Sequence, residues 1–181
     1  MKVLAMCLFA LLFLDTLSGC EKKQQESAED QALASEQRAI QRYSDETATI
    51  DPRLKKFVDA WDEAMRNEEV DTLTSAIRQR VLPALEEVIT ALTSVPTDTD
   101  RLKEAHTELV SAYRDFQAAV NLFLTEIRED NRRQPIGALL QALDTFNKKE
   151  ESYRTKMRAY YQQYNVTLVQ QTKPVRPSPK N

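Results

Sequence analysis

The alternation of apolar and polar residues predicts a chain built from long helices. In the most regular stretch, from Leu102 to Ile127, apolar residues recur at alternating gaps of three and four. This spacing places them on one face of a helix, and the opposite face carries polar side chains such as Lys103, Glu108 and Asn121. An apolar seam of this kind is typical of helices that pack side by side.

Three further stretches repeat this pattern. A second seam begins at Pro135 and continues to Tyr164, and only Glu150 interrupts it with a polar residue. An earlier stripe starts at Asp51-Pro52, where an acidic capping residue precedes a proline that suits the first turn of a helix. That stripe loses its phase at Asn67 and resumes over residues 70–92, so we expect the helix to break near Asn67.

The connections between these stretches predict the architecture. Turn residues cluster between Ser94 and Asp98, and Gly137 is the only glycine after Gly19. A chain with so few glycines suits long helices better than a sheet with many turns. Helices joined by short connections must run antiparallel. The sequence therefore predicts an all-α protein, an elongated antiparallel up-down helical bundle of about four helices with a polar N-terminal tether.

Pro83 lies inside the predicted helix over residues 70–92. It lacks a backbone N–H and its ring collides with the preceding turn, so we expect it to kink or split that helix. A structural bend is the favoured interpretation, and a hinge or ligand notch is the functional alternative.

The N-terminus has the layout of a secretory signal peptide. Lys2 precedes the apolar run Val3–Leu14, which is shorter than the roughly 20 residues of a membrane-spanning helix. The run is followed by Leu17-Ser18-Gly19-Cys20. These four residues resemble the lipobox of bacterial lipoproteins. The resemblance implies transfer of diacylglycerol to the Cys20 thiol, cleavage between Gly19 and Cys20, and in many cases acylation of the new N-terminus.

These observations divide the chain into four parts. Residues 1–19 are the expected lipoprotein signal peptide, and residues 20–50 are a lipidated cysteine and polar tether that becomes helical around Glu29–Asp45 but buries little. Residues 51–168 form the helical bundle domain. Residues 169–181 are an expected disordered tail rich in proline and basic residues, or alternatively a small hook for an anionic partner.

Charge and cysteine content limit the partners and the cross-links. The formal net charge is −3, which gives no electrostatic footprint for nucleic acid. The two cysteines are Cys7 in the signal and Cys20 at the lipidation site, so we expect no disulfide. Lipoproteins of two-membrane bacteria that lack aspartate after the cysteine are usually exported to the outer membrane. Glu21 in that position implies the same location here if the source has two membranes.

The sequence offers little catalytic chemistry. His106 is the only histidine and lies on the apolar stripe of its helix, so we interpret it as a partly buried, hydrogen-bonded residue rather than a metal ligand. Neither a Glu-x-x-His pair for a di-iron centre nor a Gly-x-Ser-x-Gly elbow occurs. We therefore expect no cofactor, no metal and no enzymatic activity.

Two weaker sites complete the prediction. Arg154, Arg158 and Tyr161 form a candidate interaction surface, because arginine and tyrosine dominate interface hot spots. Pro83 and His106 form a candidate ligand notch. The leading hypothesis is a lipid-anchored helical module that binds another envelope component; the alternatives are a bundle that binds a small apolar ligand and, least favoured, a hydrolase of envelope polymers.

Overall fold

The computed structural model describes residues 18–166, with side chains from residue 28 onward, and every regular element in this range is helical. The elements are α1 (Ser18–Ala48), α2 (Asp51–Ala64), α3 (Val70–Ala76), the π-helical turn η1 (Ile77–Val81), α4 (Leu82–Thr93), α5 (Asp100–Glu126) and α6 (Arg133–Gln163). The predicted all-α class is confirmed. Residues 1–17 of the predicted signal peptide, the side chain of Cys20 and the predicted tail over 169–181 lie outside the described residues.

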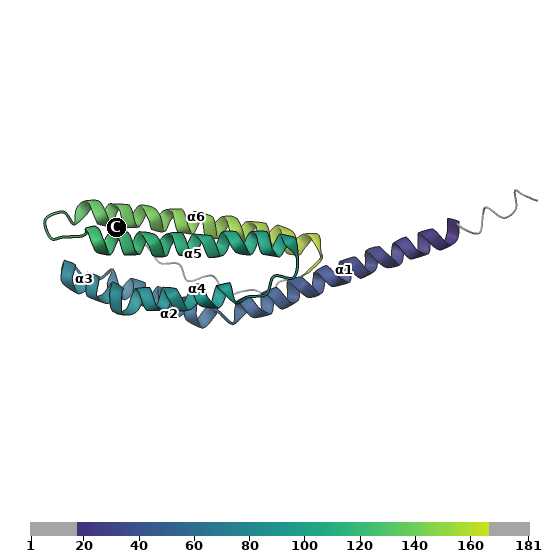
Figure 1. Ribbon diagram of the computed structural model, residues 1–181, viewed down its shortest axis with the longest axis horizontal. Helices are drawn as coiled ribbons and strands as arrows, with labels where there is room; N and C mark the ends of the chain where they lie inside the picture. The colour runs from purple at the N-terminus through teal and green to yellow at the C-terminus, as the bar shows by residue number, and fades with distance from the viewer. Residues whose placement is uncertain (1–17, 167–181) are drawn as a thin grey trace, which may run out of the picture.

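The long helices α5 and α6 lie side by side along the molecule (Figure 1). Lys156 Nζ lies 2.6 Å from Glu108 Oε2, and Lys149 Nζ lies 2.7 Å from Asp115 Oδ2. Along α5 the paired residue advances by seven while along α6 it falls by seven, so this pair of helices runs in opposite directions. The other layer, α2 to α4, lies along one side of the pair (Figure 1).

An aromatic cluster fills the space between the two layers. Phe116 of α5 is at its centre: its ring centroid lies 5.3 Å from that of Trp61, 6.3 Å from that of Phe57 and 5.2 Å from that of Phe146. All four side chains are buried. Each comes from an apolar stripe read from the sequence, and each buried aromatic side chain removes about 150–250 Å² from water. This burial holds the layers together.

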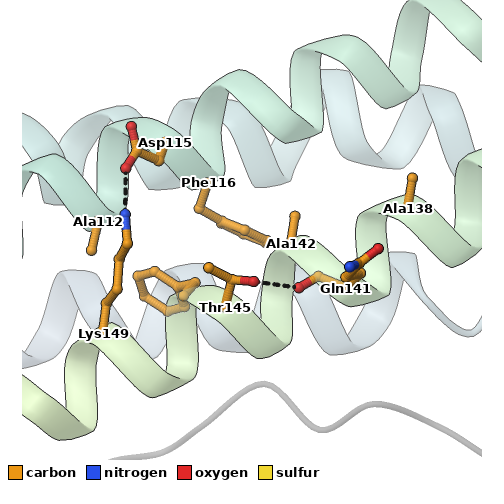
Figure 2. Close-up of a pocket in the computed structure, with 9 residues that line it drawn as sticks. Ala112, Asp115, Phe116, Ala138, Gln141, Ala142, Thr145 and Lys149 are labelled. Carbon is orange, nitrogen blue, oxygen red and sulfur yellow. Dashed lines mark hydrogen bonds and ion pairs between the residues drawn. The ribbon is translucent and has the colours of Figure 1, made fainter.

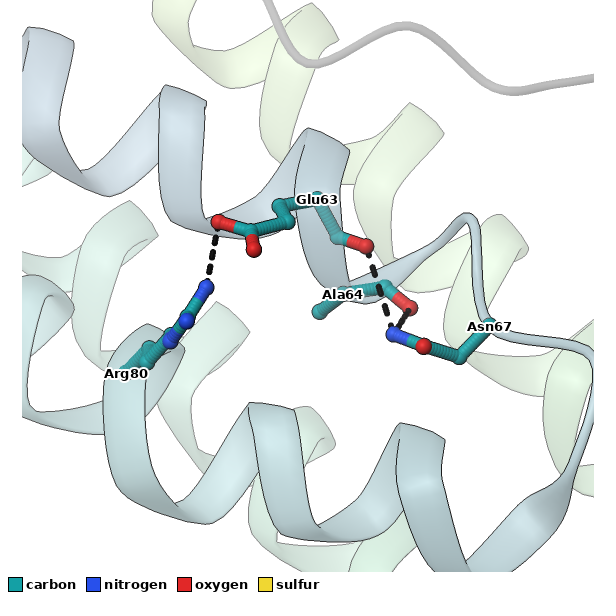
Figure 3. A network of polar contacts seen from close by, with 4 residues as sticks. All are labelled: Glu63, Ala64, Asn67 and Arg80. Carbon is teal, nitrogen blue, oxygen red and sulfur yellow. Dashed lines mark hydrogen bonds and ion pairs between the residues drawn. The ribbon is translucent and has the colours of Figure 1, made fainter.

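The helix break predicted near Asn67 is confirmed, and its cause is local. The Asn67 side-chain amide donates to the carbonyl oxygens of Ala64 at 2.9 Å and Glu63 at 3.3 Å, where α2 ends (Figure 3). The same two carbonyls also accept from the backbone N–H groups of Asn67 and Arg66. On the other side of Glu63, its carboxylate pairs with Arg80 of η1. The ion pair is exposed and contributes little to stability, whereas the Asn67 side chain adds hydrogen bonds to the last carbonyls of α2.

Pro83 does not split its helix. Helices α3, η1 and α4 follow one another without an interruption, and the Leu82 N–H bonds to the Ile77 carbonyl, five residues back. This five-residue hydrogen bond makes η1 a wider turn than an α-helical one. The wide turn η1 accommodates the proline just after it, because Pro83 falls in the first turn of α4. It also keeps the apolar stripe inward: Ile77 and Val81 are both fully buried.

Helix α1 corrects the prediction that the N-terminal segment buries little. Its exposed part, residues 28–35, extends away from the other helices (Figure 1). Its C-terminal part packs into the core, where Ile40 is 0% and Tyr43 is 1% exposed. The helix is also longer than expected, since it begins at Ser18 rather than near Glu29. The buried residues of this part are Ala39, Ile40 and Tyr43, which lie within five positions of one another, whereas Leu33 is 37% exposed.

Candidate functional site

A buried polar network joins α1 to α4, α5 and α6. The Tyr43 hydroxyl oxygen lies 2.9 Å from His106 Nδ1 and 2.7 Å from the Tyr153 hydroxyl oxygen. On the other side of the imidazole, Nε2 lies 2.8 Å from the Leu92 carbonyl oxygen. A carbonyl can only accept, so the proton sits on Nε2 and Nδ1 accepts from Tyr43. Tyr43, having used its hydrogen, accepts from Tyr153.

The network is electrically neutral near pH 7. Burial lowers the pKa of His106 below its usual value, and the Leu92 carbonyl opposes this shift only in part. Burial likewise raises the pKa of Tyr43 and of Tyr153 above the usual tyrosine value. Both nitrogens of His106 have partners within the protein, which confirms the predicted hydrogen-bonded histidine, and its side chain is buried.

The candidate ligand notch of Pro83 and His106 is not assembled. Pro83 is exposed at the start of α4, whereas His106 is buried and bonds to Leu92 near the end of that helix. Nine residues of helix separate Pro83 from Leu92, a rise of about 14 Å. The prediction placed the two residues in one notch because each is an unusual residue in an apolar stripe. The length of α4 keeps them apart.

The candidate interaction surface also needs correction. Tyr161 is only 5% exposed, and it lies close enough to Tyr43 to influence the pKa of that residue. The end of α1 covers this part of α6, where the Gln37 side chain donates to the Tyr164 carbonyl at 2.8 Å. Of the three predicted residues only Arg158 is exposed, because Arg154 is half-buried beside Glu150.

Glu150 and Arg154 form a second buried polar group on α6. Arg154 Nη2 lies 2.8 Å from Glu150 Oε1, and Glu150 is 8% exposed. Tyr113 of α5 bonds to the same carboxylate, and its pKa is raised first by burial and then by the Glu150 charge. The polar interruption seen in the sequence is therefore a paired carboxylate, with a cation and a hydroxyl as partners.

A groove between α5 and α6 was not among the predicted sites. It has a volume of about 340 Å³. Its lining includes the rings of Phe116 and Phe146 and the small side chains of Ala112 and Ala142. The Asp115–Lys149 ion pair crosses one end (Figure 2). A second groove of about 400 Å³ lies further along the same two helices, lined by Glu104, Glu108, Lys156, Met157 and Tyr160 among others. The signal that could have located the first groove was the presence of alanines on facing positions of the two seams.

Neither the comparison with known proteins nor the described residues point to a further site. No protein-family model, no curated protein sequence and no solved structure matches the chain. Within residues 18–166 no helix combines the length and the apolarity needed to cross a membrane. Over the same range, no three His, Cys, Asp or Glu side chains come together as metal ligands would.

Proposed function

We propose that the chain is a lipoprotein anchored through Cys20, whose helical domain binds another protein of the cell envelope without catalysing a reaction. The observation that carries this proposal is the apolar run followed by Leu17-Ser18-Gly19-Cys20. Two or more acyl chains at one residue hold a protein stably at a bilayer, since each buried methylene contributes about 0.8 kcal/mol. The proposed location is the outer membrane of a two-membrane bacterium.

Helix α1 supports a role as spacer between the lipid and the domain. From Cys20 to Ala39, the first buried residue in the part of α1 whose side chains are described, a helix rises by about 28 Å. The charged and amide side chains along this part suit an aqueous environment next to a membrane. Tyr43 bonds to His106 and Tyr153, so α1 is fixed to the domain. A helical spacer of this kind would hold the domain at a set distance from the lipid anchor.

We further propose that the domain is an elongated antiparallel up-down bundle and that the outer face of α5 and α6 receives the partner. The opposed pairing of α5 with α6 supports the arrangement. The groove beside Phe116 and Phe146 is of a size to accept an apolar side chain, with the Asp115–Lys149 pair next to it. Central apolar anchors with a polar rim are the usual anatomy of protein interfaces.

The anchor is tested by replacing Cys20 with alanine. The variant is expected to move from the membrane to the soluble fraction, and the wild-type protein is expected to yield an acylated N-terminal peptide that begins with Cys20. A wild-type protein with a free thiol at Cys20, or a variant that stays fully in the membrane, would contradict the proposal.

The partner is tested by purifying the lipidated protein from its own membranes. Under the proposal, a second protein is recovered in stoichiometric amount. Ala142→Arg fills the groove at little cost in helix propensity and should weaken recovery at least about tenfold. Thr155→Arg, at an exposed position of α6, is the matched control and should leave recovery unchanged. Equal recovery with both variants would place the partner elsewhere.

The groove also favours a second candidate function, the binding of a small apolar ligand. Its volume of about 340 Å³ lies at the small end of known ligand sites. Native mass spectrometry of the purified protein distinguishes the two functions. A bound small molecule without a protein partner would favour ligand binding, and its loss in Ala142→Arg would place it in the groove.

A further inference from the structure

Two grooves lie in line along the seam between α5 and α6. Phe116 and Phe146 line the first, which has a volume of about 340 Å³, and Ala105 and Met157 line the second, of about 400 Å³. The chain advances by eleven residues from Ala105 to Phe116 on α5, and again from Phe146 to Met157 on α6. Eleven residues of helix rise by about 16 Å and return to within about 20° of the starting angle. The two grooves are therefore about 16 Å apart on one face.

The charged side chains along the grooves are sorted by helix. The carboxylates of Glu104, Glu108 and Asp115 come from α5, whereas the ammonium groups of Lys149 and Lys156 come from α6. Glu108 pairs with Lys156 and Asp115 pairs with Lys149 across the seam, and these four side chains stay exposed to solvent. The face therefore has an acidic edge along α5 and a basic edge along α6.

Arg101 of α5 is the exception to this sorting. It lies at the far end of the second groove, where its Nη1 lies 2.6 Å from Gln163 Oε1 and its guanidinium lies 5.8 Å from the centroid of the Tyr160 ring. Its charge is held against the end of α6. From Glu104 to Asp115, the charged residues of α5 that line the grooves are all acidic.

The geometry of this face suits a helix better than an extended strand. The backbone groups of α5 and α6 are paired within each helix, so they offer no row of donors and acceptors to an added strand. A third helix satisfies its own backbone. It also presents side chains at positions i and i+11 from one face, about 16 Å apart, which is the separation of the two grooves.

We propose that the partner presents an amphipathic helix, which lies along the seam with an apolar side chain in each groove, basic side chains toward α5 and acidic side chains toward α6. The inference rests on the proposed function, which places the partner on this face. Charges along the edges of packed helices select the partner and its orientation. A helix running the opposite way would place its basic edge over Lys149 and Lys156, so the sorted charges also set its direction.

Photo-crosslinking in the native membranes tests the helix. A photoreactive amino acid replaces either Thr145 in the first groove or Ala159 in the second, two exposed positions that lie fourteen residues, or about 21 Å, apart. Both should cross-link to one continuous segment of the partner, at sites about fourteen residues apart. An extended segment would give sites about six residues apart.

The control positions for cross-linking are Asp144 and Arg158. Each is the exposed neighbour of a probe position, about 100° around α6 from it, and neither lines a groove. The partner should cross-link at these two positions at least about fivefold less than at Thr145 and Ala159.

An exchange of charges tests the orientation. One variant combines Glu108→Lys with Lys156→Glu and Asp115→Lys with Lys149→Glu, so both ion pairs are kept and only their direction is reversed. Recovery of the partner from membranes should fall at least about tenfold. The melting temperature should stay within about 3 °C of the wild-type value, because exposed ion pairs contribute little to stability.

The matched control exchanges an exposed ion pair of the other layer, through Lys56→Glu with Glu87→Lys. It should change recovery less than about twofold. Loss of the partner with Ala142→Arg but not with the charge exchange at the grooves would overturn this inference and leave the proposed function standing. Unchanged recovery with Ala142→Arg would overturn both.

Cross-linking supplies the outcomes that do not depend on recovery. Sites about six residues apart, sites in separate segments of the partner, or equal yields at the control positions would overturn the proposed helix. Cross-links to a second copy of this chain in place of another protein would overturn it as well.

Discussion

Replacing Tyr43 with phenylalanine tests how α1 is attached to the rest of the domain. The substitution keeps the buried ring and removes one hydroxyl, which donates to His106 Nδ1 and accepts from Tyr153. Both partners stay buried or half-buried, and each loses its hydrogen bond. A buried polar group without a partner costs about 1–3 kcal/mol, so we expect a loss of about 2–4 kcal/mol in the free energy of unfolding.

Urea and thermal unfolding followed by circular dichroism measure this loss. A domain of this length should melt about 6–12 °C lower. Tyr161→Phe is the control, since it makes the same chemical change at a buried tyrosine for which no hydroxyl hydrogen bond is found in the described residues. It should change the free energy of unfolding by less than about 0.5 kcal/mol.

Hydrogen exchange shows where the loss occurs. Amides of α1 from residue 28 to Tyr43 should exchange about 100-fold faster in Tyr43→Phe, while those in the middle of α5 should change much less. Tyr43→Phe combined with Tyr153→Phe should cost less than the sum of the single changes, because the donor left unpaired by the first is removed by the second. A cost equal to that of Tyr161→Phe would refute the view that these two hydrogen bonds hold α1 to the domain.

Three further results are expected. Because the folded protein holds the pKa of His106 below 6.5, stability should fall as the pH drops from about 6.5 toward that lowered pKa, and His106→Gln should remove this dependence in urea titrations between pH 5 and 7. Leu109→Asp buries an unpaired charge and should lower the free energy of unfolding by more than about 3 kcal/mol, whereas Thr107→Asp, exposed on the same helix, should cost less than about 1 kcal/mol. Pro83→Ala should change the melting temperature by only a few degrees, because the wide turn before it is also required by the burial of Ile77 and Val81.

The π-helical turn η1 follows from the spacing of the apolar residues around it. Leu73, Ile77, Val81 and Leu85 are separated by three successive gaps of four residues. In a regular α-helix each such gap rotates the stripe by about 40°, so the three gaps would carry it well around the helix. A π-helical turn has more residues per turn and brings the stripe back into line. The sequence pointed to Pro83 as the cause of a bend, but the spacing of the apolar residues was equally informative.

The position of Tyr161 illustrates a question that the sequence did not answer. Its helical angle places it beside the inner stripe of α6, where a residue can be either exposed or covered. Helix α1 decides the outcome, because Gln37 bonds to the Tyr164 carbonyl and Glu36 to the Tyr160 hydroxyl at the same end of α6. A contact between residues more than 120 apart in the chain leaves no trace in local periodicity.

The sequence by itself determined which residues are helical and where most helices begin and end, because these properties depend on side-chain spacing and capping within a few residues. The break at Asn67, the starts at Asp51 and near Pro135, and the inner stripe of α5 were all local in this sense. Only the tertiary structure decided that α1 docks through Tyr43, that His106 is held between two partners and that α5 and α6 leave a groove. Each of these depends on which distant helix faces a given stripe, and that choice is made by the packing of the whole domain.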